Sequence, residues 1–249
     1  MTHRTPLIRK TAASLPVPPN MADWATACAG FSWQQVRDEL APGAGDALNI
    51  ARLAVDRHTA GPLAQRTALR FIAADGAVRD LSYADLKQRS DGFAAALAGL
   101  GVGHGDRVFV LAGRVAPLYV AVLGALKSGC VVTPLFSAFG PEPIATRMTI
   151  GQARVLLTTE ALYRRKVEKV RATLPALEHV IVVGAGGAPG AAPPGTHDYE
   201  TLMAQAAHAP PPAVTTVASD MALLHFTSGT TGTPKGAIHV HEAVLTHYA

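Results

Sequence analysis

The sequence has few cysteines and few charged residues. Only two cysteines occur in 249 residues, Cys28 and Cys130, and they form no CxxC pair. Their scarcity excludes a disulfide framework and a cysteine-ligated zinc site, and it leads us to expect a protein of the reducing cytoplasm. Charged residues make up 16% of the chain and hydrophobic residues 49%, so the composition predicts a folded protein with a large core.

The chain also lacks a concentrated basic region, a long apolar run and a secretory signal. Its 22 Lys and Arg are scattered, apart from Arg164-Arg165-Lys166, so we expect no nucleic-acid partner. The longest apolar stretch, Val115 to Leu126, is too short to span a bilayer and predicts a buried helix, so we expect no membrane partner. Residues 1–30 carry several prolines and no apolar signal core, which predicts a loose N-terminal tail.

Apolar runs alternate with helical patterns through the middle of the chain. Continuous apolar strands separated by helices are typical of parallel pairing with helices on both faces of a sheet. The sequence therefore predicts an α/β fold with a mostly parallel sheet and flanking helices. The expected strands are Arg107–Ala112, Cys130–Thr133, Arg154–Thr158, His179–Val183 and Met221–Phe226.

Local signals place the helices, the loops and one hairpin. Asp75-Gly76 between two β-prone runs predicts a two-residue hairpin turn ahead of the sheet. Linker-like loops are expected near 184–197 and 209–219, where Gly and Pro gather. The expected helices are Trp33–Leu40 after the Ser32 cap, Asn49–His58, one opened by Ser82 and Asp85, Pro117–Lys127, one from Pro141, Glu160–Ala172 and Tyr199–Ala207.

A loop rich in hydroxyls and glycines follows the last expected strand. The segment TSGTTGTPKG, residues 227–236, fails the Walker A pattern because Pro234 precedes the lysine and Gly236 follows it. Its physics still suits phosphate. Gly229 and Gly232 permit close backbone approach, Lys235 supplies a positive charge, and hydroxyl donors come from Thr227, Ser228, Thr230, Thr231 and Thr233.

This loop resembles the signature of the adenylate-forming superfamily, which includes the acyl-CoA synthetases. Flanking segments around DRHTAG, GDRVFVLAGRVAPLYVAVLGALKSG and LLHFTSGTTGTPKGAIHVHEAV resemble short-form bacterial acetate–CoA ligases. The resemblance implies that Mg-ATP activates acetate or another short carboxylate as an acyl-adenylate, and that CoA then accepts the acyl group. It implies that the β- and γ-phosphates are held by Thr227, Ser228, Gly229, Thr230, Thr231, Gly232, Thr233 and Lys235.

Three further side chains are candidates through the same resemblance. His241 lies where many members place a residue near the acyl pocket, although we favour a partly exposed histidine at a helix start. Arg164 and Arg165 lie in a region resembling one that contacts the CoA 3′-phosphate, whereas a solvated helix face is the ordinary alternative. His239, His241 and His247 lack the fixed spacing of a zinc site, so no metal site is expected there.

The resemblance also leads us to expect an incomplete enzyme. Members carry a later aromatic-Gly-x-Thr-Glu segment, a ribose-binding Asp and a small domain with a catalytic Lys, and we find none of these in the 249 residues. We therefore interpret residues 31–249 as an incomplete N-terminal AMP-binding domain that is inactive alone and self-associates through an incomplete core. The alternatives are a non-catalytic α/β module that binds a nucleotide or a partner, and a metal-dependent hydrolase.

Overall fold

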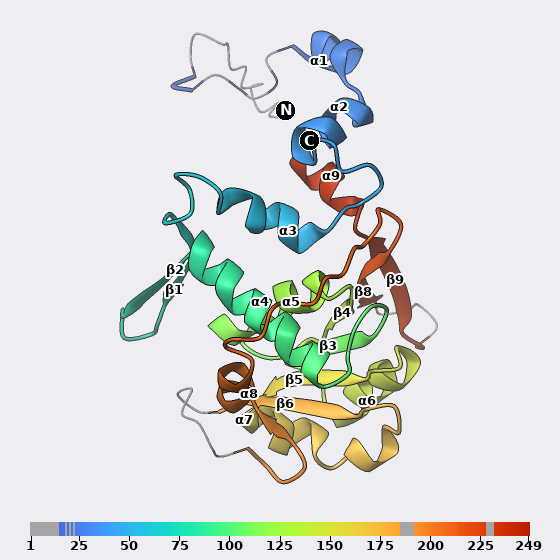
Figure 1. Cartoon of the computed structure of the whole chain (residues 1–249). Coiled ribbons are helices and arrows are strands. Elements are labelled where there is room, and N and C mark those ends of the chain that lie inside the picture. Colours follow the sequence, from blue (N-terminus) through green and yellow to red (C-terminus); the bar gives the residue numbers. More distant parts are fainter. Residues whose placement is uncertain (1–14, 18, 20, 22, 185–191, 228–231) are drawn as a thin grey trace, which may run out of the picture.

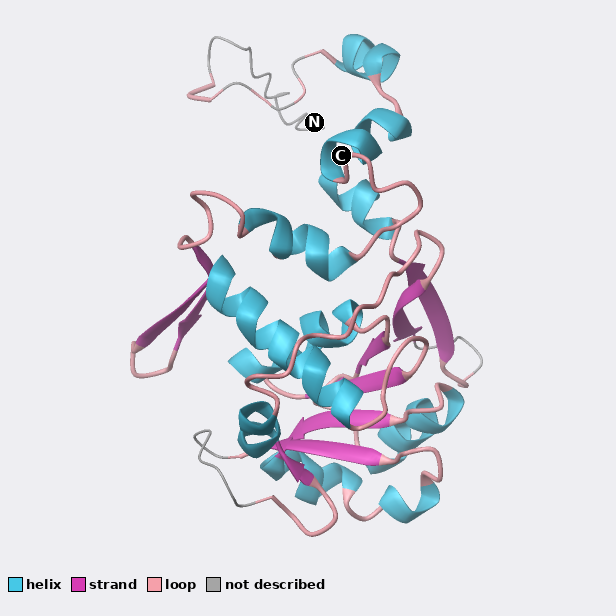
Figure 2. Ribbon diagram, in the orientation of Figure 1, coloured by secondary structure: helices cyan, strands magenta, loops and turns pink. Residues whose placement is uncertain are grey.

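The centre of the molecule is a twisted sheet with helices on both faces (Figures 1 and 2). The computed structural model describes residues 15–249, except 18, 20, 22, 185–191 and 228–231. Within them the large sheet has seven strands in the order β7-β6-β5-β3-β4-β8-β9. All neighbouring strands pair in parallel except β8 and β9, which are antiparallel. The predicted α/β fold with a mostly parallel sheet is confirmed.

The five predicted strands are present, with ends that move by one residue at most. The strands of the sheet are β3 (Arg107–Leu111), β4 (Val131–Pro134), β5 (Val155–Thr159), β6 (His179–Val183), β7 (His197–Asp198), β8 (Met221–Thr227) and β9 (Lys235–Val240). The sequence reasoning missed β7 and β9. The segment KGAIHV, with Ile238 and Val240 on alternate positions, indicates β9, but its first two residues also belong to the loop motif.

The sheet packs against two apolar clusters, one on each face. Successive side chains of a strand point to opposite faces. Accordingly Val108 and Val110 belong to the cluster under α4 (Tyr83–Gly99), α5 (Ala116–Lys127) and α8 (Tyr199–Gln205). Phe109 and Leu111 belong to the cluster under α6 (Pro141–Ile150) and α7 (Glu160–Leu162).

The predicted hairpin forms, but its turn is longer than expected. Strands β1 (Thr67–Ile72) and β2 (Val78–Ser82) pair antiparallel as a separate two-stranded sheet. Ala73 and Ala77 continue the pairing through a 2.9 Å hydrogen bond, and Gly76 has φ +84°. Residues 74–76 thus form a three-residue loop whose left-handed position requires glycine, so the expected two-residue turn was wrong.

Two predicted helices are shorter and more irregular than expected. Asn49–His58 divides into α3 (Ile50–Ala54) and a 3₁₀ turn, Asp56–His58. The predicted helix Glu160–Ala172 continues from α7 as a π-helical stretch, Tyr163–Val167, followed by a 3₁₀ turn, Arg171–Thr173. The π-helical stretch buries Tyr163, Lys166 and Val167 together, and Lys166 there donates to the carbonyls of Ser137 and Phe139.

The helices α2 (Trp33–Leu40) and α9 (Ala243–Tyr248), which come from opposite parts of the sequence, meet at the top of Figure 1, above the sheet. There α2 packs on α9 through Val36, Leu40 and Leu245. The helix α2 has its predicted bounds, and the Ser32 hydroxyl accepts from the Gln35 amide at 3.0 Å. Within the expected tail lies α1 (Trp24–Gly30), none of whose residues is buried.

Candidate functional site

The hydroxyl- and glycine-rich loop connects β8 to β9. Thr227 pairs with Lys235 at the end of this antiparallel pair, and the Thr227 hydroxyl lies 3.4 Å from the Lys235 carbonyl oxygen. Ser228, Gly229, Thr230 and Thr231 lie outside the described residues. Thr227, Gly232, Thr233 and Lys235 are exposed, so their donors are open to a ligand from solvent.

Two glycines of the motif are required by the backbone. Gly232 has φ +83°, a conformation that side chains with a Cβ rarely adopt. Gly236 lies in β9 opposite Phe226, and a Cβ there would sit 2.8 Å from Leu224 Cδ1. The glycine after Lys235 therefore permits close packing of the strand pair, whereas Gly232 permits the turn.

The loop starts from the carboxyl edge of the parallel sheet. Because β8 runs parallel to β4, and β4 to β3 and β5, the chain leaves all four strands at the same edge. The strand order reverses at β3, because the next strand in sequence, β4, lies on one side of β3 and the following strand, β5, lies on the other. Ligands of open α/β sheets bind in the crevice at this edge. The candidate phosphate loop therefore has the position expected for a binding site.

His241 is fully buried, which corrects the expectation of a partly exposed histidine. Its side chain is 0% exposed, because it lies between the Asp220 turn and the start of α3. Its Nδ1 accepts from the Ile50 backbone amide at 3.1 Å, while Nε2 has no hydrogen-bond partner among the described residues. Burial, opposed by Asp220 and assisted by His104, lowers the pKa of His241 to about 4.

The other histidines of this region do not assemble a metal centre. His225 and His239 lie across the β8–β9 pair with ring centroids 5.4 Å apart, and burial lowers the pKa of His225. Across the part of the chain that the structure describes, no three His, Cys, Asp or Glu side chains are grouped to hold a metal ion. We therefore assign none of the described residues to a metal.

The two candidate CoA arginines lie after β5, on the π-helical stretch. Arg164 is paired with Glu160 at 2.8 Å and approaches Glu168 at 4.0 Å. Arg165 is exposed and has no ion pair with any described residue. Arg165 is thus the better candidate of the two for an incoming phosphate, because its charge is not already shared with carboxylates.

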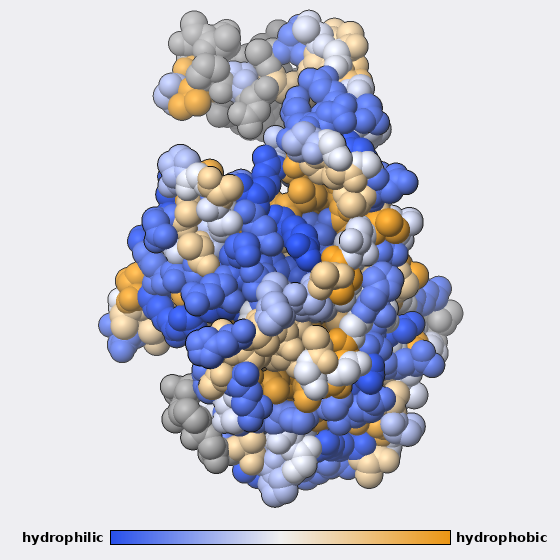
Figure 3. Space-filling view, viewed as in Figure 1, coloured by the Kyte–Doolittle hydropathy of each residue, from blue (hydrophilic) through white to orange (hydrophobic). Residues whose placement is uncertain are grey.

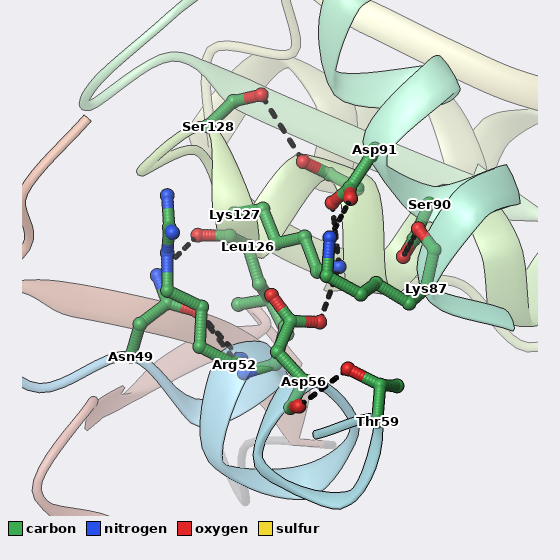
Figure 4. Close-up of polar contacts among 12 residues, drawn as sticks. Asn49, Arg52, Asp56, Thr59, Lys87, Ser90, Asp91, Leu126, Lys127 and Ser128 are labelled. Atoms are coloured by element: carbon green, nitrogen blue, oxygen red, sulfur yellow. Dashed lines mark hydrogen bonds and ion pairs between the residues drawn. The ribbon is translucent and has the colours of Figure 1, made fainter. Parts of the chain in front are cut away.

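A buried charge cluster, which the sequence reasoning missed, joins α4, α5 and the segment after α3 (Figure 4). Lys127, at the end of α5, is 2% exposed and lies 2.6 Å from Asp56 and 2.7 Å from Asp91. Asp91 in turn lies 2.5 Å from Lys87 on α4. Nearby, the Asn49 amide donates to the Leu126 carbonyl at 2.7 Å and thereby ties the start of α3 to α5.

No helix that the structure describes is long and apolar enough to cross a membrane.

Comparison with known proteins agrees with the motif. The family model described as AMP-binding enzyme matches residues 56–249. The acetyl-coenzyme A synthetase of Bacillus subtilis (strain 168) is 37% identical over 230 residues, which cover 88% of this chain and 37% of that protein. The acetyl-coenzyme A synthetase of Streptomyces coelicolor is 34% identical over 214 residues, covering 81% of this chain and 32% of that protein. The chain thus spans about a third of the length of these curated relatives.

Solved structures show the same relationship. The crystal structure of a Brucella canis acyl-CoA synthetase superposes with a TM-score of 0.77 at 30% identity, over 90% of this chain and 39% of that one. The anthranilate CoA ligase AuaEII, solved in complex with anthranoyl-AMP, gives a TM-score of 0.68 at 26% identity, over 79% of this chain and 35% of that one. With the family model matched from Asp56 onward and the signature loop on the β8–β9 turn, the chain belongs to the AMP-binding enzyme family.

Proposed function

We propose that this chain is the N-terminal part of an AMP-forming acyl-CoA synthetase that acts on acetate or another short carboxylate. The observation that carries the proposal is the TSGTTGTPKG loop at the carboxyl edge of the sheet, with Gly232 in a left-handed conformation and Lys235 exposed. The relatives support acetate as the carboxylate, because both curated proteins above are named acetyl-coenzyme A synthetases. We further propose a cytoplasmic enzyme.

In the proposed reaction, a carboxylate oxygen attacks the α-phosphorus of ATP and pyrophosphate leaves. The CoA thiol then attacks the acyl carbon of the acyl-adenylate and AMP leaves. Lys235 and the loop hydroxyls and amides would stabilise the charge on the departing pyrophosphate, and preorganised donors of this kind each contribute about 3 kcal/mol. Mg²⁺ would enter with ATP. No step is assigned to it, because the described residues contain no group of three His, Cys, Asp or Glu side chains that could hold a metal ion.

We propose that these 249 residues bind the phosphates of ATP but do not form acyl-CoA alone. The chain covers about a third of its relatives, and the donors on the β8–β9 loop address only the phosphate end of the nucleotide. A protein with phosphate contacts alone would bind ATP and pyrophosphate with similar affinity. A complete adenylation site would strongly prefer ATP.

The test is calorimetric titration of the 249-residue chain with ATP and with pyrophosphate, with and without Mg²⁺. We expect weak binding of both that Lys235→Ala reduces about tenfold, whereas Lys169→Ala, an exposed lysine on another element, leaves it unchanged. Equal binding by both variants and the parent would refute the phosphate role. Acetate-dependent exchange between pyrophosphate and ATP by the chain alone would refute the proposed inactivity. A second protein fuses this chain to the remaining part of a relative. If that fusion protein binds ATP but shows no acetate-dependent exchange, a non-catalytic nucleotide-binding module is favoured.

The CoA proposal is tested with CoA and its 3′-dephospho analogue. If Arg165 meets the 3′-phosphate, Arg165→Ala weakens CoA binding and leaves dephospho-CoA unaffected. Arg164→Ala has the smaller effect, because Arg164 is already paired with Glu160. A loss of affinity that is equal for both ligands would show that Arg165 does not contact the 3′-phosphate.

A further inference from the structure

His241 has one occupied and one free ring nitrogen. The Ile50 amide donates to Nδ1, so Nδ1 must carry the lone pair, and in a neutral imidazole the proton then resides on Nε2. Nε2 is buried and has no hydrogen-bond partner among the described residues. Burying a donor without a partner is unfavourable, so the fold holds His241 in an arrangement that packing alone would not favour.

The donor to Nδ1 is held in place by the cap of α3. Asn49 is 6% exposed, and its Oδ1 accepts from the amides of Ala51 and Arg52 at 3.1 and 3.2 Å. Its Nδ2 donates to the Leu126 carbonyl and to the Thr216 hydroxyl. The short helix α3 is thereby fixed against α5 (Figure 4), and its first amide, that of Ile50, points at the imidazole.

We propose that the backbone amide of Ile50 is a positioning group that fixes His241 as the Nε2–H tautomer. His241 is therefore a hydrogen-bond donor at Nε2 and has no lone pair there with which to accept a proton. This excludes it as a general base through Nε2. This inference stands on the hydrogen bond from the Ile50 amide and does not depend on the proposed function.

Burial keeps His241 neutral, although Asp220 favours its protonated form. The charged and titratable groups that act on it are Asp220 and His104, which form their own pair at 3.0 Å on the exposed side. His104 is 52% exposed, so this pair faces solvent while the imidazole of His241 is 0% exposed. Neutral His241 keeps a single donor across the pH range in which ordinary histidines titrate.

The tautomer is measured directly by long-range ¹H–¹⁵N spectroscopy of the histidine-labelled chain. The nitrogen coupled to both carbon-bound ring protons is Nε2, and we expect it to be the protonated one. Uniform ¹⁵N labelling adds a second readout, a coupling between the Ile50 amide nitrogen and Nδ1 across their hydrogen bond. A protonated Nδ1, or no coupling in a chain with intact amide dispersion, overturns the proposal.

Ile50→Pro supplies the variant, with Ile50→Ala as its matched control. Ile50 is the first residue of α3 and Asn49 before it is extended, with φ −141° and ψ 118°, so proline fits the backbone there while removing the N–H group. We expect both tautomers of His241 in the proline variant, together with a raised pKa, because the amide no longer stabilises the neutral ring. The alanine variant keeps one tautomer. Identical tautomers in both variants overturn the proposal. If the proline variant does not fold, the presence or absence of the coupling between the Ile50 amide nitrogen and Nδ1 in the parent chain decides the question.

Adding ATP and acetate separates this inference from the proposed function. Calorimetric binding of ATP by a chain in which both tautomers of His241 are present overturns the inference and leaves the proposed function standing. If the chain has one fixed tautomer but binds no ATP, the positioning by Ile50 holds and the proposed function fails.

Discussion

Lys127 Nζ lies between two carboxylates, 2.6 Å from Asp56 Oδ1 and 2.7 Å from Asp91 Oδ1, although its side chain is only 2% exposed. The lysine thereby joins the segment after α3, the helix α4 and the helix α5. Breaking a buried ion pair by removing one partner is strongly destabilising, because the remaining charge stays buried. We expect Lys127→Met to lower the free energy of unfolding by about 3 kcal/mol in urea titrations.

The control for this prediction is Lys169→Met. Lys169 is exposed, so the same substitution there should change the free energy of unfolding by less than about 0.5 kcal/mol. Equal stability of the Lys127 and Lys169 variants would show that the cluster contributes nothing to the fold. Replacing Lys127, Asp56 and Asp91 together by apolar residues should recover part of the loss, since the only charge left without its partner, Lys87, is 40% exposed.

The same cluster predicts a loss of stability in acid. Burial raises the pKa of Asp91, but its hydrogen bonds to Lys127 and Lys87 outweigh burial, so its pKa in the folded protein is lowered below the usual value of 3.8. A carboxylate with a depressed folded pKa stabilises the protein above its unfolded pKa, and that contribution is lost as the pH falls through the folded value. We expect the unfolding free energy to fall below about pH 4, less steeply in Asp91→Asn. Parallel acid curves for the two proteins would contradict this.

The sequence predicted the strands of the parallel sheet because they depend on local pattern. Apolar runs such as His179–Val183 and capping residues such as Ser82 specify their elements through neighbouring residues. The burial of His241 and Lys127 was not predictable in this way. Each is enclosed by residues distant in sequence, Ile50 and Asp220 for the histidine, Asp56 and Asp91 for the lysine. A polar residue that is buried through contacts with distant segments has the same kind of sequence neighbours as an exposed one, so the local sequence does not distinguish them.

Gly124 permits the close approach of α4 and α5. A Cβ at this position would lie 2.6 Å from the Ser90 carbonyl oxygen and 2.9 Å from Phe93 Cβ, and the first of these is backbone that cannot rotate away. We expect Gly124→Ala to destabilise the fold by about 1–3 kcal/mol, although alanine is the better helix former. Gly99→Ala in α4 is the matched control, because no atom lies within 4 Å of its added Cβ.

The two glycine variants should therefore change stability in opposite directions. Gly99→Ala should be neutral or stabilise by up to about 1 kcal/mol, since it reduces the entropy of the unfolded chain. Thermal or urea unfolding of both proteins measures the difference. A stable Gly124→Ala variant would show that α4 and α5 can separate without cost.

We propose that the isolated chain self-associates through apolar surface, part of which is visible among hydrophilic residues in Figure 3. Both tryptophans are exposed, Trp24 at 71% and Trp33 at 52%, and Phe31 between them is 48% exposed. Apart from these aromatic side chains, an apolar hollow of about 470 Å³ lies between α3, β1, α4 and α5, and Tyr119 and Leu123 contribute to its lining. Contiguous exposed apolar surface of this kind is typical of sites that bind another protein surface.

Sedimentation velocity over a range of concentrations tests this association. We expect the weight-average sedimentation coefficient to rise with concentration, and the fluorescence of a hydrophobic dye to increase on binding. The double variant Trp24→Gln/Trp33→Gln should reduce association, whereas Ile72→Gln, which removes an exposed apolar side chain of the separate β1–β2 hairpin, should not. Because these side chains are exposed, none of the changes should lower stability appreciably. A monomer at every concentration that leaves the dye dark would contradict the proposal, and equal association of the two variants would place the contact at the hollow near Tyr119 instead of the tryptophans.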